Sequence, residues 1–152
     1  MKRFILKVAC FFAIVVAIDI IAGMAFPYLV ANAKGGDNGR NNYICLKTNE
    51  DILIFGSSRA IHHYHPTIIS DSTGMTCYNC GQDGNGVILN YGRLLMIENR
   101  YKPKMIIYDI QNSYDLTAGE ENHKYLAWLK AYYDHDGVED VFVSVDSVER
   151  YK

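Results

Sequence analysis

The feature that most limits how this chain can fold is an apolar stretch, residues 8–31, that follows the basic segment MKRFILK. Only Asp19, Gly23 and Pro27 interrupt it. Its length matches the ~20 residues that a membrane-spanning helix needs, and basic residues before such a helix keep that end in the cytoplasm. We therefore predict contact with the membrane through residues 4–31 and export of everything that follows.

The tripeptide ANA at residues 31–33 is a small-x-small site of the kind that signal peptidase cuts, so a removed signal peptide is the alternative. The apolar stretch exceeds the ~7–15 residues of a usual signal core, which favours an uncleaved signal anchor. Residues 1–33 are then the anchor, and residues 34–42 (KGGDNGRNN) are a polar linker. Residues 43–152 form the exported domain, on the periplasmic or extracellular side.

Composition excludes some classes of function. The chain is 49% hydrophobic and 21% charged with a net charge of -2, which is ordinary for a folded protein. Its lysines and arginines are scattered, whereas a nucleic-acid interface normally needs a basic patch. We predict no nucleic-acid partner and no cofactor.

Export places three cysteines, Cys45, Cys77 and Cys80, in an oxidising compartment, where two of them can pair and the pairing stays open. The spacing of CYNC (residues 77–80) also occurs in zinc and redox sites. A zinc site would need a second pair of ligands, and the nearest candidates are the histidines of HHYH at residues 62–65. We favour buried structural cysteines and predict no metal.

Within the domain, short apolar runs alternate with segments of helical spacing. The runs are residues 52–55, 75–79 and 105–110, and the helical segments are residues 66–74, 87–101 and 122–133. This alternation is typical of an α/β fold in which helices cover both faces of a parallel sheet, giving three layers. The carboxyl ends of parallel strands meet at one edge, where ligands bind.

Polar residues follow each predicted strand, so they should gather at that edge. They are Ser57, Ser58 and Arg59 after the first strand, Gln82, Asp83 and Asn85 after the second, and Asn112, Ser113 and Asp115 after the third. Gly56 permits the sharp turn that presents a serine hydroxyl. The alternative is that the serines only cap a helix.

A reactive serine needs a base and donors for the developing oxyanion. We place Arg59, Asp83 and Asn85 in the substrate-binding part of the site. Arg59 is expected either to bind an anionic group of the substrate or to pair with Asp83. Asp109, in the middle of the third predicted strand, is expected to support the third loop, because a buried carboxylate needs partners.

Three motifs resemble blocks of the SGNH (GDSL-type) hydrolases: FGSSRA, YNCGQDG and IIYDIQNSYD, in that order. The resemblance is nearest to the exported, membrane-anchored bacterial branch, and it implies a flavodoxin-like parallel sheet. It also implies that Ser58 is the nucleophile, that Gly84 donates its backbone N–H to the oxyanion, and that the side chain of Asn112 completes the oxyanion hole. A one-residue gap would move the last match to Ser113.

The fourth block of that family, an Asp-x-x-His that supplies the base, does not occur in residues 1–152. The fold is therefore expected to be incomplete, the N-terminal part of a longer protein, with a bare sheet edge that invites self-association. The resemblance implies an exported serine esterase or O-acyltransferase whose substrate is an acylated glycan or a small ester. The alternative is a non-catalytic binding or scaffold module of the cell envelope.

Overall fold

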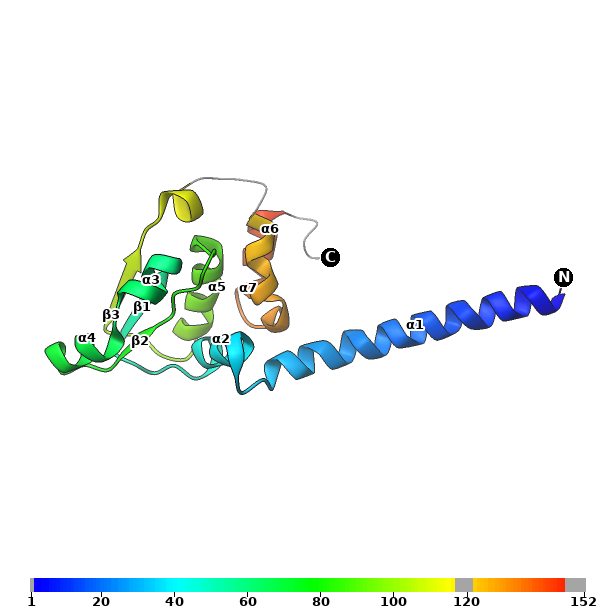
Figure 1. Cartoon of the computed structure of the whole chain (residues 1–152), viewed down its shortest axis with the longest axis horizontal. Coiled ribbons are helices and arrows are strands. Elements are labelled where there is room, and N and C mark those ends of the chain that lie inside the picture. Colours follow the sequence, from blue (N-terminus) through cyan, green and yellow to red (C-terminus); the bar gives the residue numbers. More distant parts are fainter. Residues whose placement is uncertain (1, 117–121, 147–152) are drawn as a thin grey trace.

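The computed structural model describes residues 2–116 and 122–146. α1 (Lys2–Ala31) projects from a folded domain as one long helix (Figure 1). Among the described residues it is the one helix long and apolar enough to cross a membrane, and none of its residues is buried. A signal sequence shares this length and composition, so α1 is a candidate membrane anchor or a signal sequence.

The domain is built on a parallel sheet of three strands, as the sequence predicted. The strands are β1 (Ile52–Gly56), β2 (Cys77–Asn79) and β3 (Met105–Asp109), in the order β2-β1-β3. Ile52 of the central strand lies opposite Cys77 and Met105. β1 is buried along its whole length, which explains its continuous run of apolar residues.

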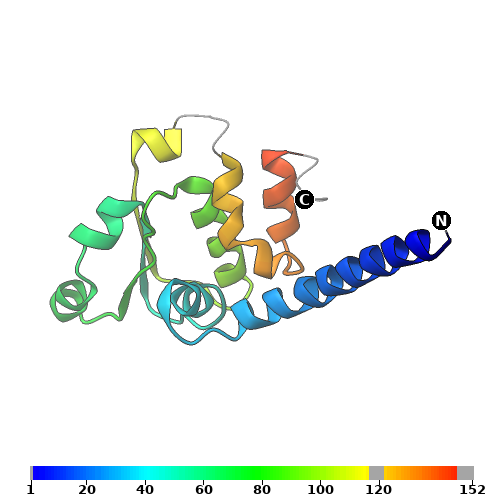
Figure 2. The ribbon, with the colours of Figure 1, turned by 45° about the vertical axis from the view of Figure 1, so that its right-hand side comes forward.

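Helices cover both faces of this sheet (Figures 1 and 2). They are α2 (Gly36–Leu46), α3 (Ser58–His63), α4 (Pro66–Thr73) and α5 (Val87–Glu98). α2 and α5 lie on one face, where Ile44 and Ile97 pack against Leu53 and Phe55 of β1. α3 and α4 lie on the opposite face. The α/β class predicted from the sequence is confirmed.

A second layer of helix packs on the outer side of α5 (Figure 2). After the π-helix η1 (Asn112–Leu116), its elements are α6 (Asn122–Tyr125), the 3-10 turns η2 (Leu126–Trp128) and η3 (Lys130–Tyr132), and α7 (Val138–Val145). The single helix predicted over residues 122–133 is therefore divided. Leu126, Leu129 and Tyr132 are buried at a spacing of three residues, which suits the 3-10 geometry better than the α-helix.

Residues 34–42 do not form the predicted linker. From Gly36 onward they belong to α2, and Asn41 and Asn42 are buried inside the domain. The glycine and asparagine content suggested a flexible segment, because neither residue favours a helix. Tertiary hydrogen bonds to the two asparagines outweigh that preference.

Candidate functional site

The turn after β1 depends on a glycine. Gly56 has a φ of 141°, a conformation that residues with a side chain rarely adopt. A Cβ at this position would lie 2.8 Å from Cβ of Ala60 and 2.8 Å from the carbonyl oxygen of Asp109. Glycine therefore lets both α3 and β3 approach the end of β1.

The two serines after Gly56 have different surroundings. Ser57 is fully buried, and its hydroxyl donates a hydrogen bond to Oε1 of Gln111, just beyond β3. Ser57 makes no side-chain capping bond to α3. Ser58 is the first residue of α3 and half-buried, and its hydroxyl has no hydrogen-bond partner among the described residues. Of the two, Ser58 has the hydroxyl that is available for reaction.

The second loop lies directly against α3. Gly81 comes so close that a Cβ there would sit 2.7 Å from the backbone nitrogen of Ile61. Asn79, at the end of β2, stabilises this contact with three hydrogen bonds. Its Nδ2 donates to the carbonyl oxygens of Ala60 at 2.7 Å and Tyr64 at 3.0 Å. Its Oδ1 accepts a hydrogen bond of 2.9 Å from the N–H of Gly81. The first and second strand ends therefore form one rigid unit.

Gly84 lies in a tight turn of the second loop, closed by a bond of 3.2 Å from Asn85 N–H to the carbonyl oxygen of Gln82. Its φ of 65° is left-handed. Asn85 is buried, and its Nδ2 donates to the carbonyl oxygen of Asp83 at 2.8 Å. The side chain of Asn85 thus stabilises the turn that carries Gly84.

The first and third strand ends are joined by an ion pair. Arg59 donates to Oδ1 of Asp109 from Nη2 and, at 3.0 Å, from Nε, and also to the carbonyl oxygen of Ile110 at 2.7 Å. Pairing of Arg59 with Asp83 was one of the two roles expected, and the structure gives the partner as Asp109. A hydrogen bond from Tyr64 to the same carboxylate raises the pKa of Tyr64.

Asn112 begins η1, three residues after the last residue of β3, and is exposed. The carboxylate of Asp115 holds this loop, because it accepts hydrogen bonds from the Tyr108 hydroxyl at 2.7 Å and from Gln111 N–H at 2.6 Å. Burial raises the pKa of Tyr108. Because the three strands are parallel, the segments that follow them, which carry Ser58, Gly84 and Asn112, leave the sheet at the same edge.

His62 adds a titratable group to this edge. It lies four residues after Ser58 on α3, and its Nε2 is 3.0 Å from Oδ1 of Asp83. Side chains four residues apart lie on the same face of a helix. The histidines of residues 62–65 also line a cavity of about 390 Å³ with Arg40. The pairing of His62 with Asp83 was not predicted from the sequence, although the four-residue spacing between Ser58 and His62 was visible there.

A buried arginine behind the site was not predicted. Arg93, on α5, is completely buried. Its Nε donates a hydrogen bond to Oδ1 of Asn41 at 2.9 Å. Its Nη1 donates to the carbonyl oxygen of Cys80 at 2.9 Å, and its Nη2 donates to Oε1 of Gln82 at 3.3 Å. Burial lowers the pKa of Arg93. Arg40 adds a second donor to Gln82 at 3.3 Å. The base of the second loop is therefore held by two cations.

All four cysteines are free thiols in the structure. Burial raises the pKa of the Cys45 thiol to about 11 and that of Cys80 to about 12, so both are protonated near neutral pH. A protonated, buried thiol is a poor nucleophile. Across the described residues no three histidine, cysteine or acidic side chains are grouped to hold a metal ion.

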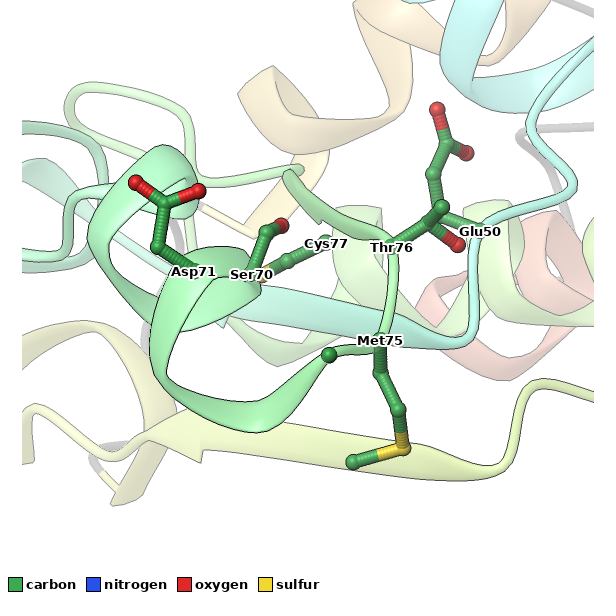
Figure 3. Close-up of a pocket in the computed structure, with 7 residues that line it drawn as sticks. Glu50, Ser70, Asp71, Met75, Thr76 and Cys77 are labelled. Carbon is green, nitrogen blue, oxygen red and sulfur yellow. The ribbon is translucent and has the colours of Figure 1, made fainter.

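A separate pocket of about 440 Å³ lies at the opposite edge, where β2 begins (Figure 3). In the figure, Asp71 and Met75 point away from Glu50. The carboxylate of Glu50 is already engaged, because it accepts a hydrogen bond of 2.6 Å from the Tyr43 hydroxyl. This pocket gathers no set of reactive groups, and the carboxyl edge of the sheet remains the candidate site.

No protein-family model, no curated protein and no solved structure matches the chain.

Proposed function

We propose that this protein is a membrane-anchored, exported serine esterase or O-acyltransferase of the SGNH type that acts on acylated carbohydrate. One observation carries the proposal: three loops, from three parallel strands, bring Ser58, Gly84 and Asn112 to one edge of the sheet. The order β2-β1-β3 agrees with the first three positions of a flavodoxin-like sheet, which supports the finer fold assignment.

The chemistry would proceed through an acyl-enzyme. Oγ of Ser58 attacks the ester carbonyl carbon and loses its proton to a base, while the N–H of Gly84 and the amide of Asn112 stabilise the oxyanion. The C–O bond to the sugar then breaks, and the sugar oxygen takes the proton. Water releases the acyl group in an esterase, and a second hydroxyl accepts it in an acyltransferase.

Two sources of the base are compatible with this site. The resemblance implies an Asp-x-x-His block, which does not occur in residues 1–152. Within this chain, His62 with its carboxylate partner Asp83 is one turn of helix from Ser58. A His62→Gln variant separates the two, because it removes activity only if His62 is the base.

Hydrolysis of a small acetyl ester by the full-length protein in detergent tests the proposal. Ser58→Ala is expected to lower kcat/KM by about a thousandfold or more, since a serine site loses most of its rate with its nucleophile. Ser72→Ala is the matched control: it removes an exposed serine on α4 whose hydroxyl donates to the carbonyl oxygen of Ile68. A Ser58→Ala protein as fast as the parent would overturn the proposal.

A non-catalytic binding module of the cell envelope is the second candidate, because residues 1–152 contain no Asp-x-x-His. It predicts that the parent protein binds an acylated oligosaccharide but does not release acetate from it. Binding by calorimetry together with acetate release from the same sample distinguishes the two functions.

A further inference from the structure

An apolar groove of about 210 Å³ lies where α1 meets the domain. We call it the α1 groove. On the helix it is lined by Phe26, Pro27 and Val30, and on the domain by Ala127, Trp128 and Lys130. Its walls are mostly carbon, and Lys130, at its side, is exposed.

The position of the groove along α1 matches the edge of a bilayer. A hydrocarbon core ~30 Å thick takes ~20 helical residues. Counted from Val8, just after the basic segment, ~20 residues end at Pro27. Pro27 lines the α1 groove, so the groove opens at the depth where lipid acyl chains meet their headgroups.

The two walls of the groove are fixed to each other by buried asparagines. Nδ2 of Asn42 donates to the carbonyl oxygens of Val30 (2.7 Å) and Ala33 (3.0 Å) at the end of α1. Oδ1 of Asn42 accepts the hydroxyl proton of Tyr132. The neighbouring Asn41 donates to the carbonyl oxygen of Trp128 at 2.8 Å. The groove is therefore a preformed part of the fold.

We infer that the α1 groove holds the upper part of one acyl chain of a membrane phospholipid. Its walls offer apolar surface, and they are continuous with the helix that faces the lipid. A cavity of ~150 Å³ holds a benzene-sized guest, so this groove fits a segment of chain and not a whole lipid. Tryptophan is enriched at membrane interfaces, and the ammonium group of Lys130 complements a lipid phosphate.

The inference rests on the proposed anchoring of α1, so both are tested on one sample. The full-length chain is reconstituted into phosphatidylcholine vesicles, and flotation first reports whether it is membrane-bound. Trp128 is the one tryptophan of the sequence, so its fluorescence reports on the groove alone. The probe is phosphatidylcholine with bromine on the acyl chain, either near the headgroup or near the terminal methyl.

Bromine near the headgroup is expected to quench Trp128 at least twofold more than bromine near the methyl end. Ala127→Glu, which puts a charge into the groove at an exposed position, is expected to remove most of that quenching. Ala127→Phe, which fills the groove without a charge, should do the same. Val143→Glu adds the same charge to an exposed position on α7 and should quench like the parent.

Failure to float would overturn the anchoring on which the inference depends. Flotation without quenching of Trp128 would overturn the inference that the α1 groove holds an acyl chain, but it would leave the membrane anchoring of α1 intact. Equal quenching in the parent and in both Ala127 variants would show that Trp128 meets the bilayer without holding a chain, which also overturns the inference.

Discussion

At the scale of single residues, Arg93 connects α5 to α2 and to the second loop through buried hydrogen bonds. Its guanidinium is completely buried and donates to α2 through Asn41 and to the second loop through Cys80 and Gln82. A buried cation is tolerated only when its donors are satisfied, and here neutral acceptors satisfy them. Without Arg93, Asn41 and the carbonyl oxygen of Cys80 each lose a hydrogen-bond donor, whereas Gln82 keeps the donor from Arg40.

Replacing Arg93 with methionine is expected to lower the free energy of unfolding by about 3 kcal/mol, because several buried acceptors lose their donor. Urea unfolding in detergent, followed by circular dichroism, measures this change. Lys102→Met is the matched control, since Lys102 is exposed and its ion-pair partner in the described part of the chain is Glu98 on the surface. A loss below about 1 kcal/mol for Arg93→Met would contradict the role given to Arg93.

At the scale of elements, two thiols are buried in the core: Cys45 on α2 and Cys80 directly after β2. Burial raises the pKa of both thiols above the ordinary value of 9.0, so the folded protein keeps their protons to higher pH than the unfolded chain. The contribution of these protons to the free energy of unfolding is fully present below pH 9.0. It is lost as the pH rises toward the pKa values in the folded protein, about 11 for Cys45 and about 12 for Cys80.

We therefore expect the urea midpoint, measured with a reductant present, to fall steadily between pH ~9 and pH ~11. Cys80→Ala should flatten this fall, because one of the two thiol protons no longer contributes. Cys10→Ala, at an exposed position on α1, is the control and should leave the slope unchanged. A parent midpoint that stays constant over this range would contradict the thiols' buried state.

The sequence predicted the elements whose signals are local. Apolar runs located all three strands, and Gly56 located the turn that exposes Ser58. α2 was not predicted, because its asparagines are stabilised by Trp128 and Tyr132, which are distant in the sequence. The partner of Arg59 could not be predicted either, because Asp109 is distant in the sequence and lies beside Arg59 only in the folded domain.

At the scale of the whole molecule, β3 is an edge strand that pairs with β1 on one side. The outer edge of β3 has no neighbouring strand among the described residues, and Met105, Ile106 and Ile110 are 47%, 41% and 57% exposed there. Natural proteins usually protect such edges, because unpaired backbone groups template pairing with other chains. This edge is the place where self-association or a further strand would extend the sheet.

Placing a lysine at Ile106 is expected to reduce self-association, since a charge on an edge strand opposes pairing. Analytical ultracentrifugation in detergent compares Ile106→Lys with the parent. Ile68→Lys makes the same substitution at an exposed position on α4, so it is the control and should behave as the parent does. If the parent protein is monomeric at all concentrations, it does not self-associate, and the prediction is contradicted.

The claim on which the account depends is that Ser58 is a reactive serine. A fluorophosphonate probe tests it most directly, because it forms a phosphorus–oxygen bond with an activated serine and releases fluoride. After labelling of the full-length protein, mass spectrometry should find the adduct on Ser58, retained in Ser72→Ala and absent from Ser58→Ala. Absence of any adduct, or equal labelling of the Ser58→Ala protein, would contradict the account.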